Sequence, residues 1–134
     1  MDLNYPNNLI LFRYAEALLN YAELVGLQGN APAGGVSAQD CLDQIRTRAG
    51  LGSIPLTWEN LKSERHKEFV GEGMRFWDLI RWGDAAEVLT ENDVTFQSVR
   101  TFNPSKDKYL PIPQSEMIRT AGTGEFELKQ NPGY

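Results

Sequence analysis

The sequence of 134 residues contains one cysteine and one histidine. The lone thiol of Cys41 cannot form an intramolecular disulfide, and together with His66 it offers too few ligands for a zinc site. Basic residues are also scarce, because 13 Lys and Arg stand against 18 Asp and Glu, giving a net charge of -5. A nucleic-acid surface needs clustered Lys and Arg, so this balance argues against binding to phosphate backbones. We therefore expect no metal, no other cofactor and no nucleic-acid partner.

Long hydrophobic runs are absent too. No apolar stretch approaches the roughly 20 residues that span a bilayer, and residues 1–6 lack the basic and apolar regions of a signal peptide. With 41% hydrophobic residues, the chain is nevertheless long enough to bury a core of its own. We expect a single domain over residues 1–134.

Apolar residues spaced three and four apart predict a mainly helical protein. The clearest helix covers Leu9–Val25, where apolar residues take up more than half of the circumference, so we expect neighbours on two sides. Ser37 and Gly50 are residue types that cap the beginning and the end of a second helix, whose apolar stripe includes Cys41. Further helical segments are expected at Thr57–Phe69, Arg75–Trp82, Asp84–Leu89 and Gln114–Arg119.

Short connections between the helices predict antiparallel pairs of the helical-repeat type. The last third of the chain is different. Asn92–Phe102 alternates weakly, which fits a brief strand or an extended loop, and Tyr109–Pro113 cannot be helical because each proline forces extended geometry on the residue before it. We expect Tyr109–Pro113 to form an apolar strap across the helices. The predicted fold class is all-α, with TPR-like helix pairs and an extended, loop-rich C-terminal segment.

Residues 64–83 crowd charged and aromatic side chains together. Acidic and basic residues recur in this run at spacings of three and four, which brings them within ion-pairing distance on helices. We interpret them as a structural charge network between two helices. Its members are Glu64, Arg65, Glu68, Glu72, Arg75, Asp78 and Arg81. Trp77 falls on the apolar arc and is expected in the core, whereas Trp82 is placed to cover the charges.

A catalytic alternative uses two members of the same network. Glu68 and Glu72 would be the paired carboxylates of a glycosidase, but such an enzyme must keep one carboxyl protonated at neutral pH, and nearby arginines would hold both ionised. The serines lack the Gly-x-Ser-x-Gly context of nucleophilic enzymes. We therefore expect no enzyme activity. Among the aromatic residues, Trp58 at the start of a helix is the candidate for stacking on a sugar ring.

The charged run and its flanking segments resemble, in the right order, the signature of the SusD/RagB family. Besides the run itself, the matching segments are Arg13–Glu16, Leu18–Glu23, Ile45–Leu51, Tyr109–Pro113 and Gln130–Tyr134. The resemblance implies the glycan-binding component of a TonB-dependent nutrient uptake system. It also implies a lipid anchor at the cell outer membrane, a SusC-like transporter as partner, and oligosaccharides that are bound and not cleaved.

Members of that family are several times longer than this chain. Because Gln130–Tyr134 resembles the family's natural chain end, we interpret residues 1–134 as a C-terminal fragment of a longer parent protein. The resemblance places the signal, the lipid anchor and most of the ligand site upstream of the matched part.

A stand-alone helical scaffold that binds protein partners through its first helix is the alternative function. The broad apolar face of this helix also predicts that the isolated 134-residue chain self-associates into a homo-oligomer, because a contiguous apolar patch tends to find a partner. The residues that broaden the face are Ile10, Phe12, Leu19, Tyr21 and Leu24.

Overall fold

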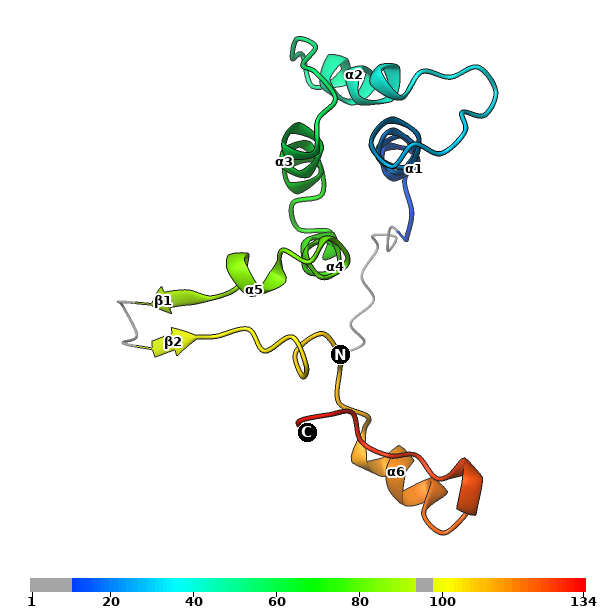
Figure 1. Cartoon of the computed structure of the whole chain (residues 1–134), viewed down its shortest axis with the longest axis vertical. Coiled ribbons are helices and arrows are strands. Elements are labelled where there is room, and N and C mark those ends of the chain that lie inside the picture. The colour runs from blue at the N-terminus through cyan, green and yellow to red at the C-terminus, as the bar shows by residue number, and fades with distance from the viewer. Residues whose placement is uncertain (1–10, 94–97) are drawn as a thin grey trace, which may run out of the picture. The chain divides into compact units, whose positions relative to one another are not determined.

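The structure is a computed structural model that describes residues 11–93 and 98–134 (Figure 1). Its helices are α1 (Tyr14–Tyr21), α2 (Ala38–Arg48), α3 (Trp58–Glu68), α4 (Met74–Trp82), α5 (Ala85–Val88) and α6 (Gln114–Thr120). A π-helical turn, Ala22–Leu27, continues α1, and a 3-10 turn, Gly124–Phe126, follows α6. Two strands, β1 (Glu91–Asp93) and β2 (Ser98–Arg100), complete the described elements.

The capping residues of α2 and α3 lie where the sequence predicted them. The hydroxyl of Ser37 accepts a hydrogen bond from the Asp40 amide, and that of Thr57 accepts one from the Asn60 amide. Each hydroxyl satisfies a backbone donor that has no partner inside the helix. Gly50, with a φ of 73°, takes the left-handed conformation that ends α2. The predicted bounds of these two helices are therefore confirmed.

The first helix differs from its prediction at both ends. Arg13 has an extended backbone, so α1 begins at Tyr14, and residues 9 and 10 of the predicted helix lie outside the described residues. At its other end the helix widens into a π turn, in which the Gln28 amide donates to the Glu23 carbonyl five residues earlier. Gly26 in this turn lies so close to Leu56 that a Cβ atom there would clash with it.

The chain divides into two compact units, and the boundary between them in the sequence falls between Gly73 and Met74. In the first unit, α1 contacts α2 and α3, and α2 also contacts the π turn (Figure 1). Its core holds Ala15, Leu18, Leu19, Ala22, Cys41, Leu42, Ile45, Leu61 and Phe69. The expectation that Cys41 is a core residue is confirmed. The single domain over residues 1–134 stays a prediction.

The apolar face of α1 is only partly buried. Leu19, which was expected on the uncovered side, is fully buried within the first unit, whereas Phe12 and Leu24 are exposed. Tyr21 is half-buried, and its hydroxyl donates to the carbonyl of Val36 in the loop before α2. Part of this broad apolar face is therefore covered by other residues of the first unit.

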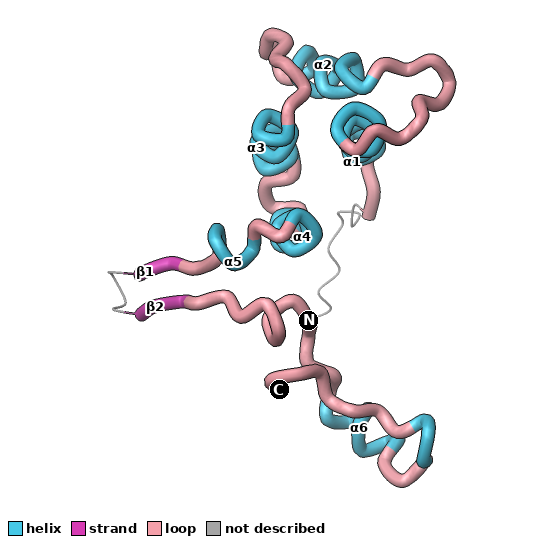
Figure 2. The backbone as a smooth tube through the Cα atoms, in the orientation of Figure 1, coloured by secondary structure: helices cyan, strands magenta, loops and turns pink. Residues whose placement is uncertain are grey.

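The second unit begins with α4 and α5, which contact each other. The antiparallel strands β1 and β2 follow, with Glu91 opposite Arg100 and Asp93 opposite Ser98. Of the two alternatives for Asn92–Phe102, the brief strand is confirmed at these residues, while Val94 and Phe96 lie outside the described part. Figure 2 shows that loops dominate beyond β2, with α6 as the main helix there.

The strap Tyr109–Pro113 is not helical, as predicted, and it is bound by the end of the chain. Its position across the helices stays a prediction. The side-chain amide of Gln130 both donates to the Ile112 carbonyl, at 3.0 Å, and accepts from the Ile112 amide, at 2.8 Å. Asn131 and Tyr134 donate to the carbonyls of Leu110 and Tyr109. Side chains thus supply the partners that a neighbouring strand would otherwise provide. The prediction of an all-α fold with a loop-rich C-terminal segment is confirmed.

Candidate functional site

The carboxylates at the end of α3 are bound by an arginine that precedes α1. The Nε atom of Arg13 donates to both carboxylate oxygens of Glu72, at 3.0 and 2.8 Å. Its Nη1 atom donates to Oε1 of Glu68 at 2.7 Å, and Nη2 donates to the backbone carbonyl of the same residue at 2.7 Å. The hydrogen bond that Arg13 donates to Glu72 raises the pKa of Arg13 most, burial opposes this shift, and the hydrogen bond to Glu68 raises the pKa further.

Two arginines of α2 complete the pairing. The Nη2 atom of Arg48 lies 2.6 Å from both oxygens of Glu68, so Glu68 is shared between two guanidinium groups. Arg46 binds Glu64, a buried residue, at 2.8 Å. We call the cluster of Arg13, Arg48, Glu68 and Glu72 the ionic junction, because it joins the segment before α1, the end of α2 and the end of α3.

The acidic residues of the predicted network therefore bind other arginines than the helical spacing indicated. Helical spacing puts Arg65 within reach of Glu68 and Arg75 within reach of Glu72. In the structure both carboxylates bind Arg13. Arg65 is buried, lies 5.2 Å from the centroid of the Phe69 ring, and donates to Asn20.

The missed partners carried a sequence signal. Arg13 opens the first segment that resembles the SusD/RagB signature, and Arg46 and Arg48 lie in another such segment, Ile45–Leu51. The motifs therefore singled out these three arginines, but the spacing of neighbouring residues did not predict which carboxylates they bind.

The remaining network residues lie on α4. Asp78 is buried and binds the Nε atom of Arg81 at 2.9 Å. The Arg81 guanidinium carbon lies 4.6 Å from the centroid of the Trp82 ring, so Trp82 covers one member of this ion pair, as expected. Arg75 is half-buried, and none of the ion pairs seen among the described residues includes it.

The ionic junction consists of ion pairs between Arg13 or Arg48 and the carboxylates of Glu68 and Glu72. A glycosidase needs one carboxyl that keeps its proton and faces the scissile bond. Glu68 and Glu72 both accept hydrogen bonds from the guanidinium group of Arg13, which links the two side chains to the segment before α1. The geometry therefore favours a role in joining helices.

The exposed aromatic residues differ from expectation at one position. Trp77, predicted in the core, is 50% exposed, and it forms an edge-to-face pair with Phe76 at a centroid distance of 5.1 Å. Within the second unit α4 contacts α5, and this helix of four residues leaves Trp77 half exposed. Trp58 is 39% exposed at the start of α3, with the Lys62 ammonium 6.0 Å from its ring centroid.

Metal and membrane sites have no support in the described part of the chain. No group of three or more His, Cys, Asp or Glu in residues 11–93 and 98–134 is placed to hold a metal ion. His66 is exposed and Cys41 is buried, where burial raises the pKa of its thiol. Among the described helices, none has both the length and the apolar character needed to cross a membrane.

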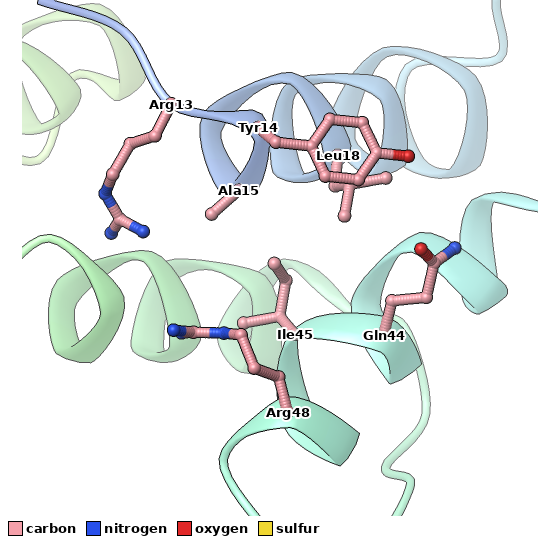
Figure 3. Close-up of a pocket in the computed structure, with 7 residues that line it drawn as sticks. All are labelled: Arg13, Tyr14, Ala15, Leu18, Gln44, Ile45 and Arg48. Carbon is pink, nitrogen blue, oxygen red and sulfur yellow. The ribbon is translucent and has the colours of Figure 1, made fainter.

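A pocket of about 320 Å³ lies between α1 and α2, next to the ionic junction. Tyr14, Ala15 and Leu18 line it from α1, and Gln44, Ile45 and Arg48 from α2, with Arg13 at one end (Figure 3). Its walls thus combine apolar side chains, one aromatic ring, one amide and two guanidinium groups.

Comparison with known proteins identifies the family. The model of the SusD family matches residues 3–134. A SusD-like protein of Formosa agariphila is 32% identical over 124 residues, which cover 85% of this chain and 23% of that protein.

Solved structures agree. Surface glycan-binding protein A from Bacteroides fluxus is 62% identical, with a TM-score of 0.88 over 99% of this chain and 29% of that one. The corresponding Bacteroides thetaiotaomicron protein in complex with laminarihexaose is 46% identical, with a TM-score of 0.78 over 96% of this chain and 26% of that one. The chain spans about a quarter of the length of these relatives. Its sequence and its fold agree on one assignment: the chain belongs to the SusD family.

Proposed function

We propose that this chain is part of a glycan-binding component of a TonB-dependent nutrient uptake system. The observation that carries the proposal is the likeness, at 62% identity, to a surface glycan-binding protein across 99% of the chain. The longer protein captures oligosaccharides at the cell surface, where a lipid anchors it to the outer membrane, and passes them to a SusC-like transporter. No bond is broken, and in the described part Glu68 and Glu72 serve structure through Arg13.

The chain contributes structure to this task more than it contributes ligand contacts. Its ion pairs join helices, and its length is about a quarter of that of the glycan-binding relatives. We propose Trp58, with its partly exposed ring, as the glycan contact to be tested first at the start of α3. The 134-residue chain alone should bind oligosaccharides more weakly than a dissociation constant of about 100 μM, which corresponds to roughly -5.5 kcal/mol.

The test uses the longest natural protein that contains this chain. Calorimetry against starch, mannan, host-glycan and plant oligosaccharides should show saturable binding of one class, without release of new reducing ends. Purification from outer membranes should recover a TonB-dependent transporter with it. Absence of binding to every oligosaccharide would reject the glycan proposal, and steady release of reducing ends would reject the non-catalytic one.

A helical scaffold for protein partners is the second candidate. The observation that favours it is the exposure of Leu11, Phe12 and Tyr14 together at the start of the described chain. On this alternative, the longer protein would bind a protein partner through these residues and would give no heat with oligosaccharides.

A further inference from the structure

The pocket between α1 and α2 has the dimensions of a small-ligand site. Its volume of about 320 Å³ lies at the lower end of the roughly 300–1,000 Å³ that is typical of small-molecule pockets. Figure 3 shows side chains from both helices directed into the space between them. The helices that bound it belong to the same compact unit, so the pocket is defined within one part of the chain.

The floor and one rim of the pocket are apolar. Ala15, Leu18 and Ile45 are buried side chains that line it. Tyr14 stands at the rim with 71% of its surface exposed, although it is the first residue of a helix that packs on two others. An exposed tyrosine ring above an apolar floor offers a flat surface for the C–H face of a sugar ring.

The polar groups of the pocket are suited to hydroxyl groups. The exposed amide of Gln44 can both donate and accept hydrogen bonds. The contact of Arg48 with Glu68 uses its Nη2 atom, and a guanidinium carries further N–H donors at Nε and Nη1. A sugar hydroxyl group can both donate and accept hydrogen bonds, so it can bind the amide of Gln44 as well as the guanidinium group of Arg48.

The charges next to the pocket cancel. Arg13 and Arg48 contribute two positive charges, and their partners Glu68 and Glu72 contribute two negative ones. An anionic ligand would therefore compete with two carboxylates for the same guanidinium groups, and a cationic one would meet two arginines. A neutral ligand avoids both costs.

We propose that this pocket is a weak subsite for one neutral sugar unit of an oligosaccharide. The sugar stacks on Tyr14 and exchanges hydrogen bonds with Gln44 and Arg48. This inference rests on the proposed function, which supplies glycan as the ligand class, and it adds a second contact region besides Trp58. Because a single ring buries little surface, we expect a dissociation constant of about 1 mM or weaker.

Nuclear magnetic resonance on the Phe12→Ser variant of the 134-residue chain tests the subsite, because self-association through Phe12 would otherwise cover the neighbouring Tyr14. Laminarihexaose, raised to about 10 mM, should shift the backbone amides of Tyr14 and Gln44 and the Gln44 side-chain amide, with one shared saturation curve. Tyr14→Ala should weaken this binding about tenfold or more. The matched control is Phe126→Ala, since Phe126 is 73% exposed on the other unit and should leave the curve unchanged.

Each outcome decides the proposal. Shifts at the pocket with laminarihexaose that Tyr14→Ala removes and Tyr14→Phe largely keeps support it. Two results would overturn it. One is that the anionic sugar glucuronate shifts the pocket amides while laminarihexaose does not. The other is that Tyr14→Ala leaves the saturation curve for laminarihexaose unchanged. If the longer natural protein binds oligosaccharides while the pocket gives no shifts, the subsite fails and the proposed function stands. If the longer protein binds none, the proposed function itself fails.

Discussion

Arg13 donates to Glu68 twice, once to the carboxylate and once to the backbone carbonyl, each at 2.7 Å. The carbonyl lies in the last turn of α3, where a helix leaves carbonyl groups without an internal partner. One side chain therefore satisfies a helix end and an acidic residue together. Since Arg13 precedes α1, the contact fixes where α1 begins relative to where α3 ends.

Arg13→Ala should destabilise the chain by about 1.5–3 kcal/mol, because Glu68 and Glu72 lose charge-assisted hydrogen bonds while they stay partly buried. Urea unfolding followed by circular dichroism measures the loss. Arg119→Ala is the matched control, since its ion pair with Glu116 is exposed and should contribute less than about 0.5 kcal/mol. Equal losses in the two variants would contradict a structural role for the ionic junction.

Self-association through the start of α1 should depend on Phe12 and not on Leu19. Phe12 is 83% exposed, so Phe12→Ser should shift the chain from dimer or larger species toward monomer without changing its helical content. Light scattering at micromolar concentration measures this shift. Leu19→Lys would bury a charge in the core and should unfold the chain. A wild-type chain that is monomeric from the outset would refute the prediction.

The stability of the chain should fall in alkaline solution partly through Cys41. The pKa of its thiol is raised, mainly because burial disfavours the thiolate and secondarily because Asp40 is nearby. The unfolded chain loses the thiol proton near the ordinary pKa of about 8.5. The stabilisation by the neutral thiol is therefore complete below that pH and is lost as the pH rises toward the folded-state pKa.

Urea midpoints measured across this alkaline range should fall more steeply for the wild-type chain than for Cys41→Ala. Other groups titrate in the same range, but both proteins share them, so the difference in slope isolates the thiol. Parallel slopes would mean that Cys41 ionises as readily in the folded chain as in the unfolded one.

Gln130→Ala should release the strap. The Ile112 amide donates to the Gln130 side chain at 2.8 Å, so its hydrogen exchange should accelerate in this variant. Exchange monitored by nuclear magnetic resonance at Ile112 is the measurement. Gln114→Ala, which alters an exposed amide at the start of α6, should leave that exchange rate as it is. Slow exchange retained in Gln130→Ala would show that another group protects the strap.

The helix caps and the end of α2 could be predicted from the sequence. Ser37 and Thr57 cap their helices through hydrogen bonds to residues three positions away, and Gly50 supplies a backbone conformation that other residues adopt at a cost. The fold class followed because these signals and the apolar spacing agree. Burial of Cys41 followed from the same stripe.

The ion pairs between segments far apart in the sequence could not be predicted from local patterns. Arg48 and Arg13 lie 20 and 55 positions from Glu68, so no helical period connects them. Trp77 was misplaced because a helical wheel shows which residues share a face but not whether a neighbour covers it. The pocket also escaped prediction, since its walls come from two helices whose contact only the fold defines.

These separations bear on the order in which the chain assembles. Closing a loop costs conformational entropy before the contact at its ends is gained, and contacts of wide sequence separation tend to form late. The Asp78–Arg81 pair and the helix caps can form within single turns, but Glu68 meets Arg13 and Arg48 only after three helices have docked. Removing Arg13 should therefore speed unfolding while leaving the refolding rate nearly unchanged, as expected for a contact absent from the transition state.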